Sequence, residues 1–351
     1  MEIYPHHYPL ARSYQTSIGV QRDLGGGMVI TADWARRQGE NISLGEIDQN
    51  LFTRYDGSPT PVPVIPLCPT IPDFNPMDNC STGGITFWNG QGREVYDGLL
   101  VKLNKRFSHH FQFLVSYAYQ KDVTDAGPYG VLDNAHYTSS YGQDLAHQNL
   151  NVSGTIQLPW GFLVSINSSI ISKSPLAAQI NGLDLPGTAP SGSTEALPGV
   201  EFASFGVGSS KGDLNKAVAN YNANYAGKPS ATGGPNPGPF VVPPNYQFQD
   251  PIFSQDFRLT KTFTYKEKYK LNILGEVFNA FNVSNLTYPG AAANLDPLAA
   301  GCTLASNGYS VGSCAPGAVQ TYAFGQPTGR VGQTFGQGGA RAFQVGARFQ
   351  F

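Results

Sequence analysis

Charged residues are scarce in this sequence. Only 13% of its 351 residues are Asp, Glu, Lys or Arg, which is about half of the ~25% usual in soluble domains. The formal net charge is −2, so the chain has no bulk positive charge with which to attract nucleic acid. We therefore expect no nucleic-acid partner.

Long apolar runs are also missing. No run approaches the ~18 residues of a membrane-spanning helix, and GFLVSI at 161–166 is only as long as a strand. The first ten residues, MEIYPHHYPL, contain neither the basic nor the apolar region of a secretory signal. An exported protein needs such a signal. The chain is therefore expected either to stay inside the cell or to be the C-terminal part of a longer protein.

Catalytic and metal-binding patterns are absent as well. His6–His7 and His109–His110 are adjacent pairs, whose side chains would point to opposite faces of a strand. The acidic residues form no close pair suited to acid–base catalysis. Gly25–Gly27 joins two strands instead of opening a helix, so it does not predict a phosphate-binding loop. We expect no enzyme activity, no metal and no cofactor.

The four cysteines form two local pairs. Cys68 and Cys80 are separated by 12 positions, as are Cys302 and Cys314, and each pair lies in a segment rich in Pro or Gly. Neither pair has the CxxC spacing or nearby His of a zinc site. We interpret them as two disulfides formed in an oxidising compartment, each contributing roughly 3 kcal/mol. Four unrelated thiols are the alternative.

The sequence is rich in alternating segments. Nine segments place apolar residues at alternate positions, as in a strand with one apolar and one polar face. They are residues 15–23, 28–37, 94–107, 111–121, 149–158, 162–170, 253–263, 269–281 and 341–351. The last segment, RAFQVGARFQF, carries Phe343, Val345, Phe349 and Phe351 on its apolar face.

The connections between these segments alternate strictly in length. Short turns near 24–27, 108–110, 159–161 and 264–268 alternate with long loops at 38–92, 122–146, 174–251 and 283–340. Soluble sandwiches mix their connection lengths, whereas transmembrane barrels have short periplasmic turns and long extracellular loops. We predict an all-β fold, an antiparallel up-and-down transmembrane β-barrel segment of about nine strands. The alternative is a soluble β-sandwich whose apolar faces pack together.

The few charges on the apolar face favour contact with lipid. Lys105 and Lys261 lie near short turns, and Asp97 and Lys121 lie near long loops. A Lys on the lipid face would cost ~2–4 kcal/mol at the bilayer midplane but ~0–1 kcal/mol near the interface. Aromatic residues also gather beside the short turns, as in an interfacial girdle. The apolar face is predicted to contact outer-membrane lipid.

The opposite face of the segments is polar throughout. Such a face is typical of the water-filled lumen of a barrel. The candidate lumen-lining residues are Lys102, Asn104, Arg258, Asn272, Glu276, Gln344, Arg348 and Gln350.

Several segments resemble the C-terminal half of TonB-dependent outer-membrane receptors, especially the Oar-like group with a carboxypeptidase-regulatory-like domain. The resemblance lies in QTSIGVQRDLGGGMVITADW (15–34), DGLLVKLNKRFSHHFQFLVSYAYQK (97–121), GEVFNAFNVSN (275–285) and the last strand. It implies a barrel of 22 strands, of which residues 1–351 supply about nine. The plug, the TonB box and the signal peptide would be absent from this fragment.

The resemblance also implies a function. The complete protein would take up a scarce nutrient through a plugged barrel in the bacterial outer membrane, energised by the TonB complex through the missing N-terminal region. Loops 174–251 and 283–340 would form the outer recognition surface, and the barrel-assembly machinery would recognise the last strand. Siderophore, cobalamin, oligosaccharide and peptide all remain candidate ligands. A structural or adhesive outer-membrane barrel and a soluble adhesion module are the alternative functions.

Overall fold

The computed structural model describes most of the strand-forming residues and part of the long connections. The described residues are 2–48, 86–125, 142–143, 145–181, 194–200, 203–228, 239–240, 242, 246–266, 268–288, 292–295, 303–304, 319–320, 327, 329–332 and 338–351. All four cysteines lie outside these ranges, so the predicted disulfides stay predictions.

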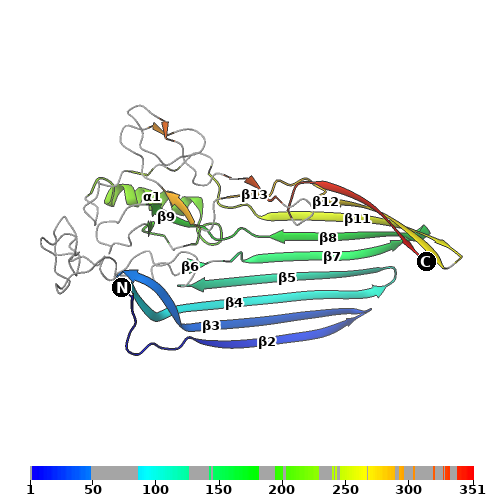
Figure 1. The fold of residues 1–351 in the computed structure, drawn as a ribbon, viewed down its shortest axis with the longest axis horizontal. Helices are drawn as coiled ribbons and strands as arrows, with labels where there is room; N and C mark the ends of the chain where they lie inside the picture. The colour runs from blue at the N-terminus through cyan, green and yellow to red at the C-terminus, as the bar shows by residue number, and fades with distance from the viewer. Residues whose placement is uncertain are drawn as a thin grey trace.

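Nine of the described strands follow one another across a single antiparallel sheet (Figure 1). They are β2 (Arg12–Gly25), β3 (Met28–Asp48), β4 (Thr86–Ser108), β5 (Phe111–Thr124), β7 (Gln148–Leu158), β8 (Phe162–Ile171), β11 (Ile252–Tyr265), β12 (Tyr269–Phe278) and β18 (Ala342–Gln350). Two short strands join this sheet, β1 (Glu2–Ile3) beside β4 and β6 (Gly142–Gln143) beside β5. The order of the nine strands in space is their order in the chain, which confirms the predicted up-and-down topology.

The short connections all lie at one end of the sheet, which we name the turn end; the opposite end is the loop end (Figure 1). His109 and His110 have φ angles of 52° and 70°, the left-handed pair that a two-residue type I′ hairpin requires. Pro159–Gly161 forms a single 3₁₀ turn between β7 and β8. The C-terminus also lies at the turn end.

Each predicted segment forms a strand, but some bounds differ at the loop end. β3 continues to Asp48 and β4 begins at Thr86, whereas the alternation predicted 28–37 and 94–107. The pairing register shifts between Gly39 and Ile42 and again further along β3. Each shift exchanges the two faces of the strand, so the alternation is interrupted although the strand continues.

The apolar face of the sheet is not covered by a second sheet among the described residues. Ile18 and Val20 of β2 are 68% and 67% exposed, and Phe343 and Val345 of β18 are 73% and 85% exposed. A soluble sandwich would bury these side chains in a dry interior. The sandwich alternative is therefore wrong, and the apolar face is available to lipid.

The main buried core lies beyond the loop end of the sheet (Figure 1). It surrounds α1 (Lys211–Asn224), which buries Leu214, Ala217, Val218 and Tyr221. The other core residues are Leu176, Ala178, Leu197, Phe205, Phe240, Tyr246 and Phe248. We name α1 and these residues the loop-end module. The sequence had predicted only a loop here, because Gly, Pro, Ser and Asn are frequent in this segment.

Short strands complete the described structure. β9 (Ala177–Asn181) pairs with β10 (Thr194–Ala196) and with β14 (Ala292–Leu295) next to the loop-end module. β13 (Leu286–Thr287) pairs with β17 (Gly329–Arg330), and β15 (Thr303–Leu304) pairs with β16 (Val319–Gln320). Across the described ranges, none of the helices combines the length and the apolar character needed to span a membrane.

Candidate functional site on the polar face of the sheet

The strand register places all eight candidate lumen residues on one face of the sheet. Six of them come from the adjacent strands β11, β12 and β18, where Arg258 lies opposite Glu276 and Glu276 lies opposite Gln344. Asn272 lies opposite Arg348 in the same way. Lys102 and Asn104 reach the same face from β4, through rows of opposed residues that cross β5, β7 and β8.

An ion pair lies at the centre of the β11–β12 part of this face. The Arg258 guanidinium donates to the carboxylate of Glu276, and only 11% of the Glu276 side chain is exposed. The pair lines a shallow cavity of about 190 Å³ together with Asn167 and Asp256. The charges of Arg258 and Glu276 therefore compensate each other on this face of the sheet.

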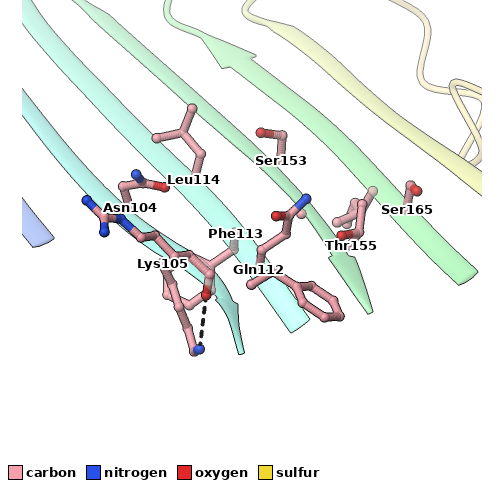
Figure 2. A pocket seen from close by; sticks show the side chains of 12 residues that line it. Asn104, Lys105, Gln112, Phe113, Leu114, Ser153, Thr155 and Ser165 are labelled. Carbon is pink, nitrogen blue, oxygen red and sulfur yellow. Dashed lines mark hydrogen bonds between the residues drawn. The ribbon is translucent and has the colours of Figure 1, made fainter. Parts of the chain in front are cut away.

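A larger hollow lies between β4, β5, β7 and β8 near the turn end (Figure 2). Its volume is about 510 Å³. Amide and hydroxyl side chains dominate its polar lining, which includes Asn104, Arg106, Gln112, Ser153, Thr155 and Ser165. In Figure 2, Asn104, Leu114 and Ser153 project from one face of the sheet, while Lys105 reaches away on the other side. This turn-end hollow can hydrogen-bond to a passing solute, and Arg106 gives its lining a positive charge.

The lysines of the apolar face behave as the sequence predicted. Lys105 Nζ donates to Ser108 Oγ at 2.6 Å and lies 4.2 Å from the centre of the Phe111 ring. Lys261 Nζ donates to the carbonyl of Trp160 and lies 4.5 Å from the Phe162 ring centre. Both ammonium groups therefore bend toward the short turns, where a charge near the interface costs little.

A third hollow lies at the loop end, between β2, β3, β4 and β5. Its volume is about 540 Å³, and its lining includes Gln15, Ser17, Arg37, Tyr96, Asp122 and Leu145. Arg37 forms an ion pair with Glu94, and its guanidinium carbon lies 6.0 Å from the centre of the Tyr96 ring. Tyr96 Oη donates to Gln120 Oε1 at 3.5 Å. This loop-end hollow brings an aromatic ring together with planar polar groups.

The loop-end hollow could not be predicted from the sequence alone. Its residues come from β2, β3, β4, β5 and the segment before β7, and no short motif connects them. A signal was nevertheless present, because Arg37, Glu94 and Tyr96 all fall on the polar parity of their strands and point to the predicted lumen.

The predicted assembly residues lie together on the apolar face of β18. The Phe349 ring stacks on Tyr269 of β12, with 6.2 Å between the ring centres, and on Phe351, with 6.0 Å. Phe351 itself is 88% exposed. These rings form an aromatic group at the turn end of an edge strand, and their recognition by the assembly machinery stays a prediction.

The described residues contain no group of three or more His, Cys, Asp or Glu that could hold a metal ion.

Known proteins provide the final comparison. Residues 1–344 match the family model described as an outer membrane beta barrel domain. Eight chains of solved structures match as well. One is the outer membrane transporter YddB from Escherichia coli, at 10% identity and a TM-score of 0.41, over 97% of this chain and 32% of that chain. The present chain thus spans about a third of that structure. No curated protein matches the chain.

Proposed function

Because the chain belongs to the outer membrane beta barrel domain family and resides in the bacterial outer membrane, we propose that it forms wall strands of a TonB-dependent receptor. In this proposal the complete barrel takes up a scarce nutrient. The observation that carries the proposal is the division of the sheet into an exposed apolar face and a polar face with three hollows. Wall strands with this division separate lipid from a water-lined path.

The three hollows support a transport path along which a solute would make several weak contacts. The loop-end hollow lies where a solute would enter, the Arg258–Glu276 cavity lies across the sheet from it, and the turn-end hollow lies near the opposite end. Conduction requires contacts that favour entry but still permit release. Compensated ion pairs and neutral amides meet that requirement better than a patch of one charge.

The remaining parts of the proposal concern partners. A plug domain and a TonB-contacting segment would be supplied by residues upstream of residue 1, and energy would reach the barrel through them. Outer-membrane lipid would cover the apolar face, and the barrel-assembly machinery would recognise β18. The protein would act by binding and transport, without enzyme activity, cofactor or nucleic acid.

Genetics in the source bacterium tests this function. The gene would be deleted, and growth compared on a panel of scarce nutrients supplied at limiting concentration. We expect the deletion to impair growth on one of them, and a strain without TonB to show the same defect. A nutrient defect in the gene deletion, together with normal growth on that nutrient in a strain that keeps the gene but lacks TonB, would instead indicate a passive barrel.

A structural or adhesive barrel is the second candidate, because the loop-end module has a buried core of its own. Its helix packs on aromatic residues, with 4.1 Å between the ring centres of Tyr221 and Phe240. A module of this kind can present a rigid surface outside the cell. Loss of surface attachment in the gene deletion, together with normal growth on every nutrient, would favour this function over transport.

A further inference from the structure

The Tyr96 ring lies across Gly98 on the polar face of β4. A Cβ atom added to Gly98 would come within 2.6 Å of Tyr96 Oη and within 2.9 Å of two ring carbons. Those separations are too short for any side chain, so the ring occupies the space that a residue larger than Gly would need. An aromatic ring that covers a strand glycine in this way is held against the wall of the sheet.

Planar polar groups surround this ring. The Arg37 guanidinium lies over it, Gln120 accepts the bond from its hydroxyl group, and Asp122 lines the same hollow from β5. Gln15 and Ser17 line the hollow from β2. Guanidinium, carboxylate and amide groups offer two donors or acceptors in fixed geometry. Such groups can bind two neighbouring hydroxyl groups of one ligand at once.

The charges that face the loop-end hollow are one cation and two carboxylates. Arg37 is paired with Glu94, and Asp122 lines the hollow from β5, whereas Arg36 and Asp97 pair on the apolar face. An anionic ligand would compete with Glu94 for the Arg37 guanidinium and would be repelled by Asp122. Electrostatic complementarity therefore disfavours an anionic ligand, and the uncharged hydroxyl groups of a sugar are compatible with this lining. The volume of about 540 Å³ falls within the ~300–1,000 Å³ of small-ligand sites.

We infer that the loop-end hollow binds a neutral oligosaccharide, with one sugar ring stacked on Tyr96. The face of an aromatic ring is negative and attracts the weakly positive C–H groups on the flat side of a sugar ring. The hydroxyl groups at the edge of the sugar would then meet Arg37, Gln120 and Asp122. The inference rests on the proposed function, since it names the class of nutrient that the barrel would admit.

Binding is tested on the full-length protein purified in detergent. Maltohexaose, cellohexaose, xylohexaose and mannohexaose serve as probes in isothermal titration calorimetry. We expect at least one of them to bind and Tyr96→Ala to weaken that binding by about tenfold or more, because the ring supplies the apolar contact. Tyr96→Phe keeps the ring and should retain the affinity within about threefold.

A pair of glycine variants tests the position of the ring. Gly98→Ala would displace the Tyr96 ring and should weaken binding as strongly as Tyr96→Ala does. Gly275→Ala is the matched control, because a Cβ added to this strand glycine would have no atom within 4 Å. Circular dichroism of each variant verifies that the sheet is retained. Failure of all four probes to bind, or binding unchanged in both Tyr96→Ala and Gly98→Ala, would overturn the inference.

The remaining measurements separate the ligand class from the transport function. Hexagalacturonic acid, an anionic oligosaccharide, should bind more weakly than the neutral probe, and tighter binding would contradict the charge argument. Sugar binding that depends on Tyr96 without TonB-dependent uptake would leave the site intact and refute the proposed transport. TonB-dependent uptake of another nutrient, without sugar binding, would refute the site and leave the transport function intact.

Discussion

The side-chain amide of Asn279 donates a hydrogen bond of 2.7 Å to the main-chain carbonyl of Gly339, 60 residues later in the chain. Asn285 makes the corresponding bond to Gly338, at 2.8 Å. Both residues are 1% exposed. These two bonds tie the loop ends of β11 and β12 to the segment that leads into β18, so the last strand enters the sheet at a fixed position.

Replacing Asn279 with Ala should destabilise the protein. Asn279 also exchanges hydrogen bonds with Val283, so the substitution leaves the buried carbonyl of Gly339 and the half-buried N–H of Val283 without these partners. A buried group that loses its partner costs about 1–3 kcal/mol. We expect a loss of that order in the free energy of unfolding, measured by denaturant titration in detergent.

Asn282 provides the control for this substitution. Both residues have left-handed φ angles, 44° for Asn279 and 53° for Asn282, and Ala is disfavoured in that region. Asn282 is exposed, so Asn282→Ala measures the conformational cost without the buried amide. Equal losses in the two variants would show that backbone conformation, not the hydrogen bonds, explains the effect.

The assignment of the two faces can be tested at adjacent positions of β4. Val101 lies on the apolar face opposite Tyr117, and Leu100 lies on the polar face opposite Ala118. A Lys on the lipid face near the bilayer midplane costs ~2–4 kcal/mol. Val101→Lys should therefore lower the stability in lipid vesicles, while Leu100→Lys should have little effect. The reverse result would mean that the faces have been exchanged.

Much of this fold could be predicted from the sequence because membrane strands follow a simple period. Lipid on one side and water on the other explain the alternation of β4, β5 and β18, although Leu100 and Leu114 lie on the polar face. The extension of β3 beyond residue 40 could not be predicted in this way. Its register shifts depend on pairing with β4, across a connection of several dozen residues.

The loop-end module and the loop-end hollow were missed for different reasons. Leu214, Ala217, Val218 and Tyr221 have the spacing of a buried helix face, but the abundance of Asn and Gly around them indicated a loop. Arg37, Tyr96 and Asp122 lie far apart in the sequence and form no recognisable motif. Strand register brings them together, and a single sequence specifies that register only through the complete sheet.

The first turn of α1 should loosen at low pH. Hydrogen bonds from the Ser210 side chain and backbone lower the pKa of the Asp213 carboxyl below its ordinary value. A lowered pKa in the folded state means that the stabilisation is present above the unfolded pKa of ~3.9 and is lost as the pH falls through the folded pKa. Amide hydrogen exchange of residues 211–216, corrected for its intrinsic pH dependence, should show this loss. Asp213→Asn should abolish the dependence, and an unchanged profile in that variant would assign it to another group.

The cysteine pairs lead to a chemical prediction. Cys68 should be joined to Cys80, and Cys302 to Cys314, if these segments reach an oxidising compartment. Mass spectrometry of non-reduced proteolytic peptides from outer-membrane fractions should detect both linked pairs and no link between them. Free thiols at all four positions would leave the pairs without a structural role.

The exposed end of β18 should matter for assembly more than for stability. Phe351 is 88% exposed, so Phe351→Ala removes little buried contact and should change the free energy of unfolding by no more than about 0.5 kcal/mol. It also removes one ring of the aromatic group that Phe349 and Tyr269 form beside it. We expect less protein in the outer membrane, measured by fractionation and immunoblotting.

Gln350→Ala, on the polar face of the same strand, should assemble normally. Normal assembly of Phe351→Ala would show that the assembly machinery does not require the terminal ring.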